Sequence, residues 1–382
     1  MRLRPFLASP LLCLGLTLAC GSSSSPSIPT GTLTLRLGSD SFPGYSQAMV
    51  SLEKLEASPD GATWIPLGNV KATFDLMALQ SGHSALILPA TRVDAGSYAQ
   101  FRLTWATVSY QAPVIGQPPA PPAYVIPTGG SGLILSMPVT TVVSGPITVA
   151  ASGTTTAQIM LNGQHAVQVR TGPTFTFQPT GRAYDLAASA SITGHLGDGA
   201  TSLVGVEAFA ETVDGLGTAT LQRRAYTDAS GNYVLECLPT GSLYFVAAQP
   251  ASLTNAYAAA AAAPVNATAA TAYTANLAFS APQVPGSLTL TITPASTATQ
   301  GTWGELRQSL ATGGTGSQFL IVRSQTVASS AASDQVTFLG LAPSIYGLTA
   351  QRSTSGAAPA VKIGAQVSVS AGATATTALS FP

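Results

Sequence analysis

Apolar and polar residues alternate in short runs along most of this chain. The run Thr32-Leu33-Thr34-Leu35-Arg36-Leu37 has a period of two, which is typical of a half-buried β-strand. Turn-forming residues such as Pro59-Asp60-Gly61 and Ser144-Gly145-Pro146 separate the runs. Similar runs occupy 47–57, 63–67, 72–76, 85–88, 99–108, 132–143, 155–160 and 174–178. Many short strands at close spacing predict an all-β protein made of tandem β-sandwich domains.

The second half of the chain contains an internal repeat. The same number of residues separates Tyr244 from Tyr346, Gln249 from Gln351, and Phe279 from Phe381. A single offset over this length indicates two related domains. We therefore predict sandwiches at 31–188, 189–284 and 285–382, with matching last strands at 275–279 and 377–381.

The first 30 residues have the pattern of an export signal and a tether. Arg2 and Arg4 precede a short apolar stretch that ends at Ala19, and a Ser/Pro-rich segment follows from 20 to 30. Cys20 directly after Ala19, with a Ser-rich segment behind it, resembles the lipobox of bacterial lipoproteins. This resemblance implies that residues 1–19 are removed, that Cys20 carries lipid (palmitate), and that the protein is membrane-anchored. The alternative is a non-lipidated signal that is cut after Ala19.

Composition limits the possible partners. The formal net charge is +0 and only 8% of the residues are charged, against about 25% in ordinary domains. No basic patch is available for nucleic acid. After signal removal and anchoring, Cys237 is the one remaining cysteine, so no intrachain disulfide is expected and the side chain is predicted to be a small buried hydrophobe.

Residues 31–181 resemble a bacterial lipoprotein family that is classed as a domain of unknown function (4382). The resemblance rests mainly on two segments, Phe74-Asp75-Leu76-Met77-Ala78-Leu79 and Asp94-Ala95-Gly96-Ser97-Tyr98-Ala99-Gln100-Phe101-Arg102-Leu103. It implies an envelope lipoprotein but brings no catalytic residue.

Residues 190–248 are similar to carboxypeptidase regulatory-like (prealbumin-like) domains. The matching motifs are Gly205-Val206-Glu207-Ala208, Thr227-Asp228-Ala229-Ser230-Gly231-Asn232-Tyr233 and Leu238-Pro239-Thr240-Gly241-Ser242-Leu243-Tyr244. In such a domain the Asp228–Asn232 segment is expected to form a tight hairpin turn, and Tyr233 and Tyr244 to pack or hydrogen-bond at a corner. The class shares its fold with starch-binding-like modules, which implies carbohydrate binding by analogy only.

Few residues suggest catalysis. The three histidines, His83, His165 and His195, are far apart in sequence and form no zinc-binding pattern, so neither a metal nor a cofactor is predicted. A Ser/His/Asp triad assembled in space stays open, although no nucleophile-elbow motif is present. Alternating Asp228, Ser230 and Asn232 faintly resemble a calcium loop, but a hairpin turn is favoured.

Aromatic residues are the remaining candidates for ligand contact. Trp64 and Trp105 lie in alternating runs and are predicted to be core, whereas Trp303, in the Gly-rich stretch 300–304, is the better candidate for an exposed ligand-binding residue. The sequence therefore predicts a non-enzymatic, lipid-anchored envelope protein. The lipoprotein resemblance implies the outer membrane, because the residues after Cys20 include no Asp that would retain the protein at the inner membrane. The modules of this protein would bind a glycan or protein partner or act as a structural display. A carbohydrate-binding protein, an accessory to an envelope enzyme, and a carrier with a cleft between domains are the alternatives.

Overall fold

The computed structural model describes residues 28–382 except 41, 43, 113–119, 164–166, 170–174, 297–299, 314–315, 330–331 and 355–358. Cys20, the signal, most of the tether and His165 lie outside the described residues. The prediction of an all-β chain is confirmed, because two short 3-10 turns, η1 (Leu76–Leu79) and η2 (Leu186–Ala188), are the only helical elements in the described parts. Within these parts, no helix has the length and apolar character needed to cross a membrane.

The first unit consists of twelve strands that form a single sheet. The hydrogen-bonded path runs β10-β11-β7-β6-β2-β5-β8-β12-β9-β1-β4, and β3 pairs with β2. One cluster of buried side chains draws on nearly all of these strands, so the sheet folds over and its parts face each other across one core. The strands are β1 (Thr30–Ser39), β2 (Tyr45–Ser58), β3 (Ile65–Asp75), β4 (Ala85–Asp94), β5 (Gly96–Trp105), β6 (Ala123–Pro127), β7 (Leu133–Ser136), β8 (Thr140–Val149), β9 (Thr154–Asn162), β10 (Val167–Val169), β11 (Phe175–Phe177) and β12 (Thr180–Asp185).

Strand β1 illustrates how the alternation produces this core. Leu33, Leu35 and Leu37 are all 0% exposed, while the residues between them are half-buried. β1 pairs antiparallel with β4 on one side and parallel with β9 on the other. The strand is therefore central in the sheet, and its leucines point into the core.

The middle unit has two sheets. One has the order β16-β13-β20 with β21 also on β13, and the other has β15-β14-β17-β18 with β19 on β17. Its strands are β13 (Ser189–Gly197), β14 (Glu207–Val213), β15 (Ala219–Tyr226), β16 (Asn232–Pro239), β17 (Leu243–Ala248), β18 (Ala260–Ala261), β19 (Val265–Asn266), β20 (Ala272–Thr274) and β21 (Leu277–Ala278).

The third unit has the corresponding pair of sheets. Their orders are β25-β26-β22-β30 and β24-β23-β27-β28, with β29 on β27, so the main strands of the two units match one for one. The strands are β22 (Gly286–Thr293), β23 (Gln300–Ala311), β24 (Ser317–Thr326), β25 (Ala328–Ser329), β26 (Asp334–Leu341), β27 (Ser344–Thr354), β28 (Ala360–Ile363), β29 (Val367–Val369) and β30 (Thr374–Ser380).

A tyrosine hydroxyl is bonded to a nearby upstream carbonyl once in each unit. Tyr98 donates to Asp94 O at 2.8 Å, Tyr244 to Pro239 O at 2.7 Å, and Tyr346 to Ala342 O at 2.8 Å. All three rings are buried. This is the arrangement of a tyrosine corner, which fixes the path of the chain where a strand begins.

The turn at Asp228 corrects one prediction. The Asp228 carboxylate accepts bonds from the backbone N–H groups of Ser230 and Asn232, and Gly231 has a φ of +77°. The turn is therefore tight, as expected. The strands that it joins are not a hairpin, however, because β15 pairs with β14 while β16 pairs with β13 in the opposite sheet.

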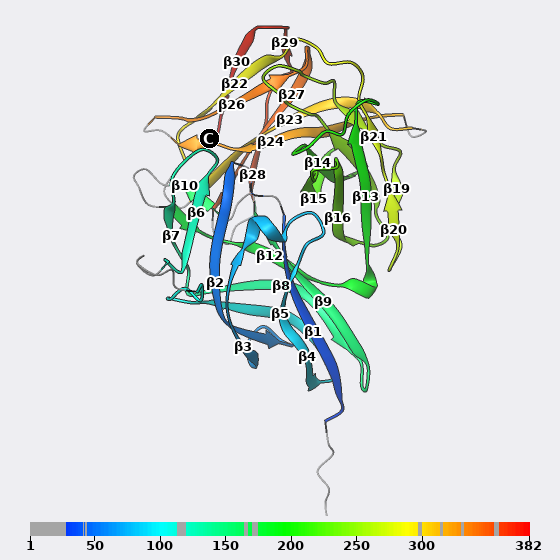
Figure 1. The fold of residues 1–382 in the computed structure, drawn as a ribbon. Coiled ribbons are helices and arrows are strands. Elements are labelled where there is room, and N and C mark those ends of the chain that lie inside the picture. Colours follow the sequence, from blue (N-terminus) through cyan, green and yellow to red (C-terminus); the bar gives the residue numbers. More distant parts are fainter. Residues whose placement is uncertain are drawn as a thin grey trace, which may run out of the picture.

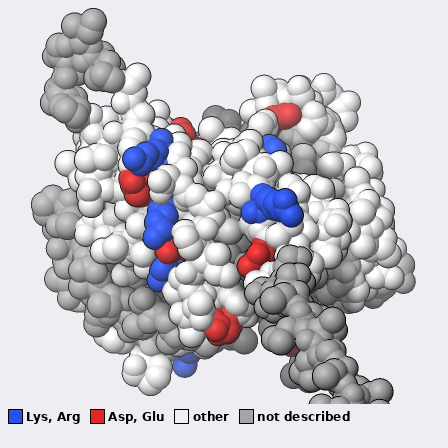
Figure 2. Space-filling view, turned by 90° about the horizontal axis from the view of Figure 1, so that it is seen from below, with Lys and Arg blue, Asp and Glu red and all other residues white. Residues whose placement is uncertain are grey.

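The three units are packed together rather than strung out in a line. Figure 1 shows the first unit in the lower half, with the middle and third units side by side above it. Ala219, Phe245 and Ala247 of the middle unit belong to the buried cluster of the third unit, so one face of the β15-β14-β17-β18 sheet is covered by its neighbour. The face seen from below carries few charged side chains, and both signs are intermixed (Figure 2).

Candidate functional site

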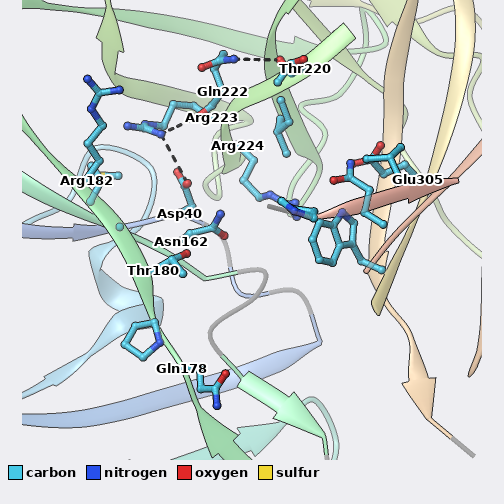
Figure 3. A pocket seen from close by; sticks show the side chains of 18 of the residues that line it. Asp40, Asn162, Gln178, Thr180, Arg182, Thr220, Gln222, Arg223, Arg224 and Glu305 are labelled. Atoms are coloured by element: carbon cyan, nitrogen blue, oxygen red, sulfur yellow. Dashed lines mark hydrogen bonds and ion pairs between the residues drawn. The ribbon is translucent and has the colours of Figure 1, made fainter. Parts of the chain in front are cut away.

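A cavity of about 940 Å³ lies where the three units meet. Its walls come from β8, β9 and β12 of the first unit, β15 of the middle unit, and β23, β27 and β28 of the third. Such a volume is in the range of small-molecule binding sites, which often form between domains. Figure 3 shows the polar side chains that surround it, among them Asp40, Arg182, Arg223 and Glu305.

Arg223 joins the first and middle units at the floor of the cavity. It extends from β15, its guanidinium donates to the backbone carbonyls of Gln222, Glu236 and Cys237, and its Nη1 lies 4.0 Å from Asp40 Oδ2. The guanidinium also lies 4.5 Å from the centre of the Tyr184 ring. Carbonyls of the middle unit therefore hold the Arg223 guanidinium, which faces Asp40 and Tyr184 of the first unit.

Asp40 is a buried carboxyl on the cavity wall. Burial raises its pKa above the usual value, and the nearby Arg223 and Arg224 partly offset that effect. Its Oδ1 has no hydrogen-bond partner among the described residues. An unpaired oxygen at this depth is the kind of group that a bound water or ligand satisfies.

The third unit contributes a compact ion pair. Glu305 accepts bonds from Arg307 Nη2 at 2.9 Å and from Gln351 Nε2 at 2.7 Å, so both of its oxygens are used. Arg307 Nη1 also donates to Ala219 O on β15 at 3.1 Å. The pair therefore ties the third unit to the edge of the middle unit.

Arg224, also on β15, is paired with another carboxylate, that of Glu207. Its Nη1 donates to Glu207 Oε1 at 3.0 Å, and the guanidinium lies 5.8 Å from the centre of the Phe209 ring. Its Nη2 is buried and has no partner in the described part of the chain. Arg223, Arg224 and Arg307 thus each have an acidic neighbour.

Arg182 differs from these three. It lies on β12 and its side chain is exposed at the cavity wall. Its guanidinium carbon lies 5.6 Å from the centre of the Tyr184 ring. Among the described residues it has neither a hydrogen bond nor an ion pair, so its donors are available to a ligand.

Trp303 requires a correction. It is only 3% exposed, because the Gly-rich stretch 300–304 forms the start of the inner strand β23. The residue nevertheless lines the cavity. Its role in ligand binding stays a prediction.

Trp105 and Trp64 were both predicted to be core, and only the prediction for Trp105 is confirmed. Trp105 is core as predicted, 4% exposed, with its indole N–H donating to Thr141 Oγ1 at 2.9 Å. Trp64 is not core, since it is half-buried just before β3, with Arg102 4.3 Å from its ring centre.

The remaining candidate residues do not come together. His83 is exposed in a turn of the first unit, whereas His195 lies in β13 with Nε2 3.0 Å from Ser202 Oγ. Cys237 is buried as predicted, and burial raises its pKa to about 12. No group of three or more His, Cys, Asp or Glu residues that could hold a metal ion is found within the described ranges.

Sequence reasoning missed the cavity arginines. Their signal is the adjacent pair Arg223-Arg224 in a chain that has only 15 Lys and Arg residues. Charged side chains are scarce in this chain but gather at this junction. Consecutive residues of a strand point to opposite faces, so Arg223 and Arg224 place one guanidinium on each face of β15.

Comparison with known proteins identifies one part of the chain. Residues 30–183 match the model of a family described as a domain of unknown function, DUF4382, which agrees with the resemblance read from the sequence. No curated protein matches the chain.

Three solved structures give weak similarity. They are the TIE protein of Bacillus anthracis (12% identity, 92% of this chain and 51% of that one, TM-score 0.19), a streptococcal ancillary pilin (10%, 91% and 98%, 0.21) and a minor pilin of Streptococcus agalactiae (15%, 50% and 95%, 0.19). The chain thus spans about half the length of the TIE protein. Scores this low support no inference about function.

Proposed function

We propose that this protein is a non-enzymatic, lipid-anchored binding protein of the bacterial cell envelope, and that the cavity between its three units is the binding site. The observation that carries the proposal is the convergence of polar side chains from all three units on one cavity of about 940 Å³. A purely structural display would need no such cavity, whereas binding proteins commonly place their sites between domains.

The anchor rests on the sequence pattern around Cys20. The expected modification is tested by growing cells with an alkyne analogue of palmitate and comparing the natural chain with Cys20→Ala. Label on the natural chain and none on the variant would support the anchor. Equal label on both, or no label on either, would contradict it.

The middle unit supports the likeness to carboxypeptidase regulatory-like domains. Tyr233 donates to Ala275 O and Tyr244 to Pro239 O, which are the corner contacts that the motifs predict. We propose that this unit is such a domain, and that the binding activity is directed at carbohydrate. An accessory role beside an envelope enzyme is compatible with the same site.

The binding site is tested by filling the cavity. Thr220 is exposed and lines the cavity, so Thr220→Trp would occupy part of its volume. The matched control is Thr376→Trp, an exposed strand residue on β30 that does not line it. On an array of envelope glycans, Thr220→Trp should lose ligands that the control retains. Equal binding by the two variants would place the site elsewhere.

A further inference from the structure

We propose that the cavity binds an acidic saccharide, and that Arg182 receives its carboxylate or sulfate group. The inference rests on the proposed function and specifies its ligand. It follows from which side chains of the cavity are already engaged with the protein and which are not.

Three of the four arginines that line the cavity have an acidic neighbour, and the fourth has none among the described residues. Arg307 is paired with Glu305, Arg224 with Glu207, and Arg223 lies beside Asp40. Arg182 has no acidic partner among the described residues, although it is exposed and lines the same cavity. The cavity therefore offers an unneutralised guanidinium, which prefers an oxyanion because it can donate two parallel hydrogen bonds to it.

Uncharged polar groups line the same cavity as that cation. Gln178 and Thr180 line the cavity from the first unit, and Thr218 and Thr220 line it from the middle unit. Figure 3 shows Thr180 between Gln178 and Arg182. None of these four side chains has a partner in the described part of the protein. Hydroxyl and amide groups both donate and accept, so they match the hydroxyl groups of a sugar.

A peptide is disfavoured because the free edge of β15 is already capped. Among the described strands, β15 pairs only with β14. The carbonyl of Gln222 accepts from Arg223 at 2.6 Å, that of Thr220 from the Gln222 side chain at 3.5 Å, and that of Tyr226 from Ser81 Oγ at 2.7 Å. An added peptide strand would have to displace these bonds, whereas a ligand recognised by side chains would not.

Aromatic stacking contributes little to this site. Trp303 is 3% exposed, and Arg223 lies 4.5 Å from the centre of the Tyr184 ring. Recognition must then depend on hydrogen bonds and on the charge of Arg182. Because Arg182 is exposed, salt should weaken the interaction.

The experiment is a calorimetric titration of the full-length protein with tetrasaccharides of galacturonate, mannuronate and glucuronate. Each is compared with its carboxyl-reduced, neutral form, and a sulfated neutral tetrasaccharide distinguishes sulfate from carboxylate. Arg182→Gln removes the proposed contact. Arg92→Gln is the control, since Arg92 is an exposed arginine on β4 that does not line the cavity.

We expect at least one acidic tetrasaccharide to bind. Carboxyl reduction (or desulfation) and Arg182→Gln should each weaken binding roughly tenfold, the loss that follows from a charged hydrogen bond. Arg92→Gln should leave the affinity unchanged. Equal binding of the acidic and neutral forms, with no effect of Arg182→Gln, would overturn the acidic ligand but leave the binding function standing. The proposal of an acidic saccharide would also be overturned if no acidic saccharide binds or if acidic peptides displace the bound one. In that case the comparison of Thr220→Trp with Thr376→Trp still tests the proposed binding function.

Discussion

Tyr346→Phe should destabilise the protein more than the same substitution at the equivalent Tyr244. The Tyr346 hydroxyl donates to Ala342 O at 2.8 Å and accepts from Gln249 Nε2 at 2.6 Å, so it also connects the third unit to the middle one. Ala342 and Gln249 are 1% and 2% exposed, which leaves no water to replace the lost bonds. Two lost hydrogen bonds and two buried groups without their partners cost about 2–4 kcal/mol.

The same change at Tyr244 removes one bond, to Pro239 O, which is only half-buried. A loss of about 1 kcal/mol is expected there. Burial raises the pKa of Tyr346 to about 12, so its hydroxyl stays protonated and the difference should persist between about pH 6 and 9.

The assay is urea unfolding followed by circular dichroism, with stability differences taken from midpoints at an unchanged slope. A cost for Tyr346→Phe equal to or smaller than that for Tyr244→Phe would refute the role of the hydroxyl in joining the two units.

Three further predictions concern buried ionisable groups. Asp334→Ala should cost about 3–5 kcal/mol in thermal unfolding because it leaves Arg352, 7% exposed, without its partner at 3.1 Å, while Ala in place of the exposed Asp94 should cost less than about 1 kcal/mol. Burial raises the pKa of Glu211 well above 4.5, so the folded state keeps a proton that the unfolded state releases, and stability falls as pH rises above 4.5. Glu211→Gln removes that loss, so the unfolding free energy of the variant minus that of the natural chain should grow by about 1.4 kcal/mol per pH unit as the pH rises above 4.5. A difference that does not change with pH would argue against a buried, protonated Glu211. Finally, in a chain that begins at Gly31, Cys237 should not react with a thiol reagent until the protein unfolds, because it is 2% exposed and its pKa is raised to about 12; rapid labelling of the folded protein would contradict its burial.

Alternation in the sequence predicted most of the strands because most have one buried and one wetter face. The leucines of β1 and the two aligned tyrosines, Tyr244 and Tyr346, occupy the environments that the pattern indicated. Strand β23 was missed for a physical reason. Both of its faces are covered, and Glu305 and Arg307 are buried against the middle unit, so the strand has no polar face to alternate with.

The cavity could not be predicted from local pattern. Arg182, Arg223 and Arg307 lie in different units, and only the packing of three sheets brings them to one place. Strand pairing likewise explains why a turn with hairpin chemistry at Asp228 joins two sheets, since β15 pairs with β14 while β16 pairs with β13. Residues within the turn determine its geometry, whereas pairing with distant strands determines the sheet to which each flanking strand belongs.

Hydrogen exchange of the backbone amides, with and without the tightest-binding acidic tetrasaccharide, tests the location of the site most directly. Ligand should slow exchange in 180–184 of the first unit and 218–224 of the middle unit, because both segments line the cavity. Protection confined to other segments, such as the turn at 227–232, would contradict a binding site at the junction of the three units.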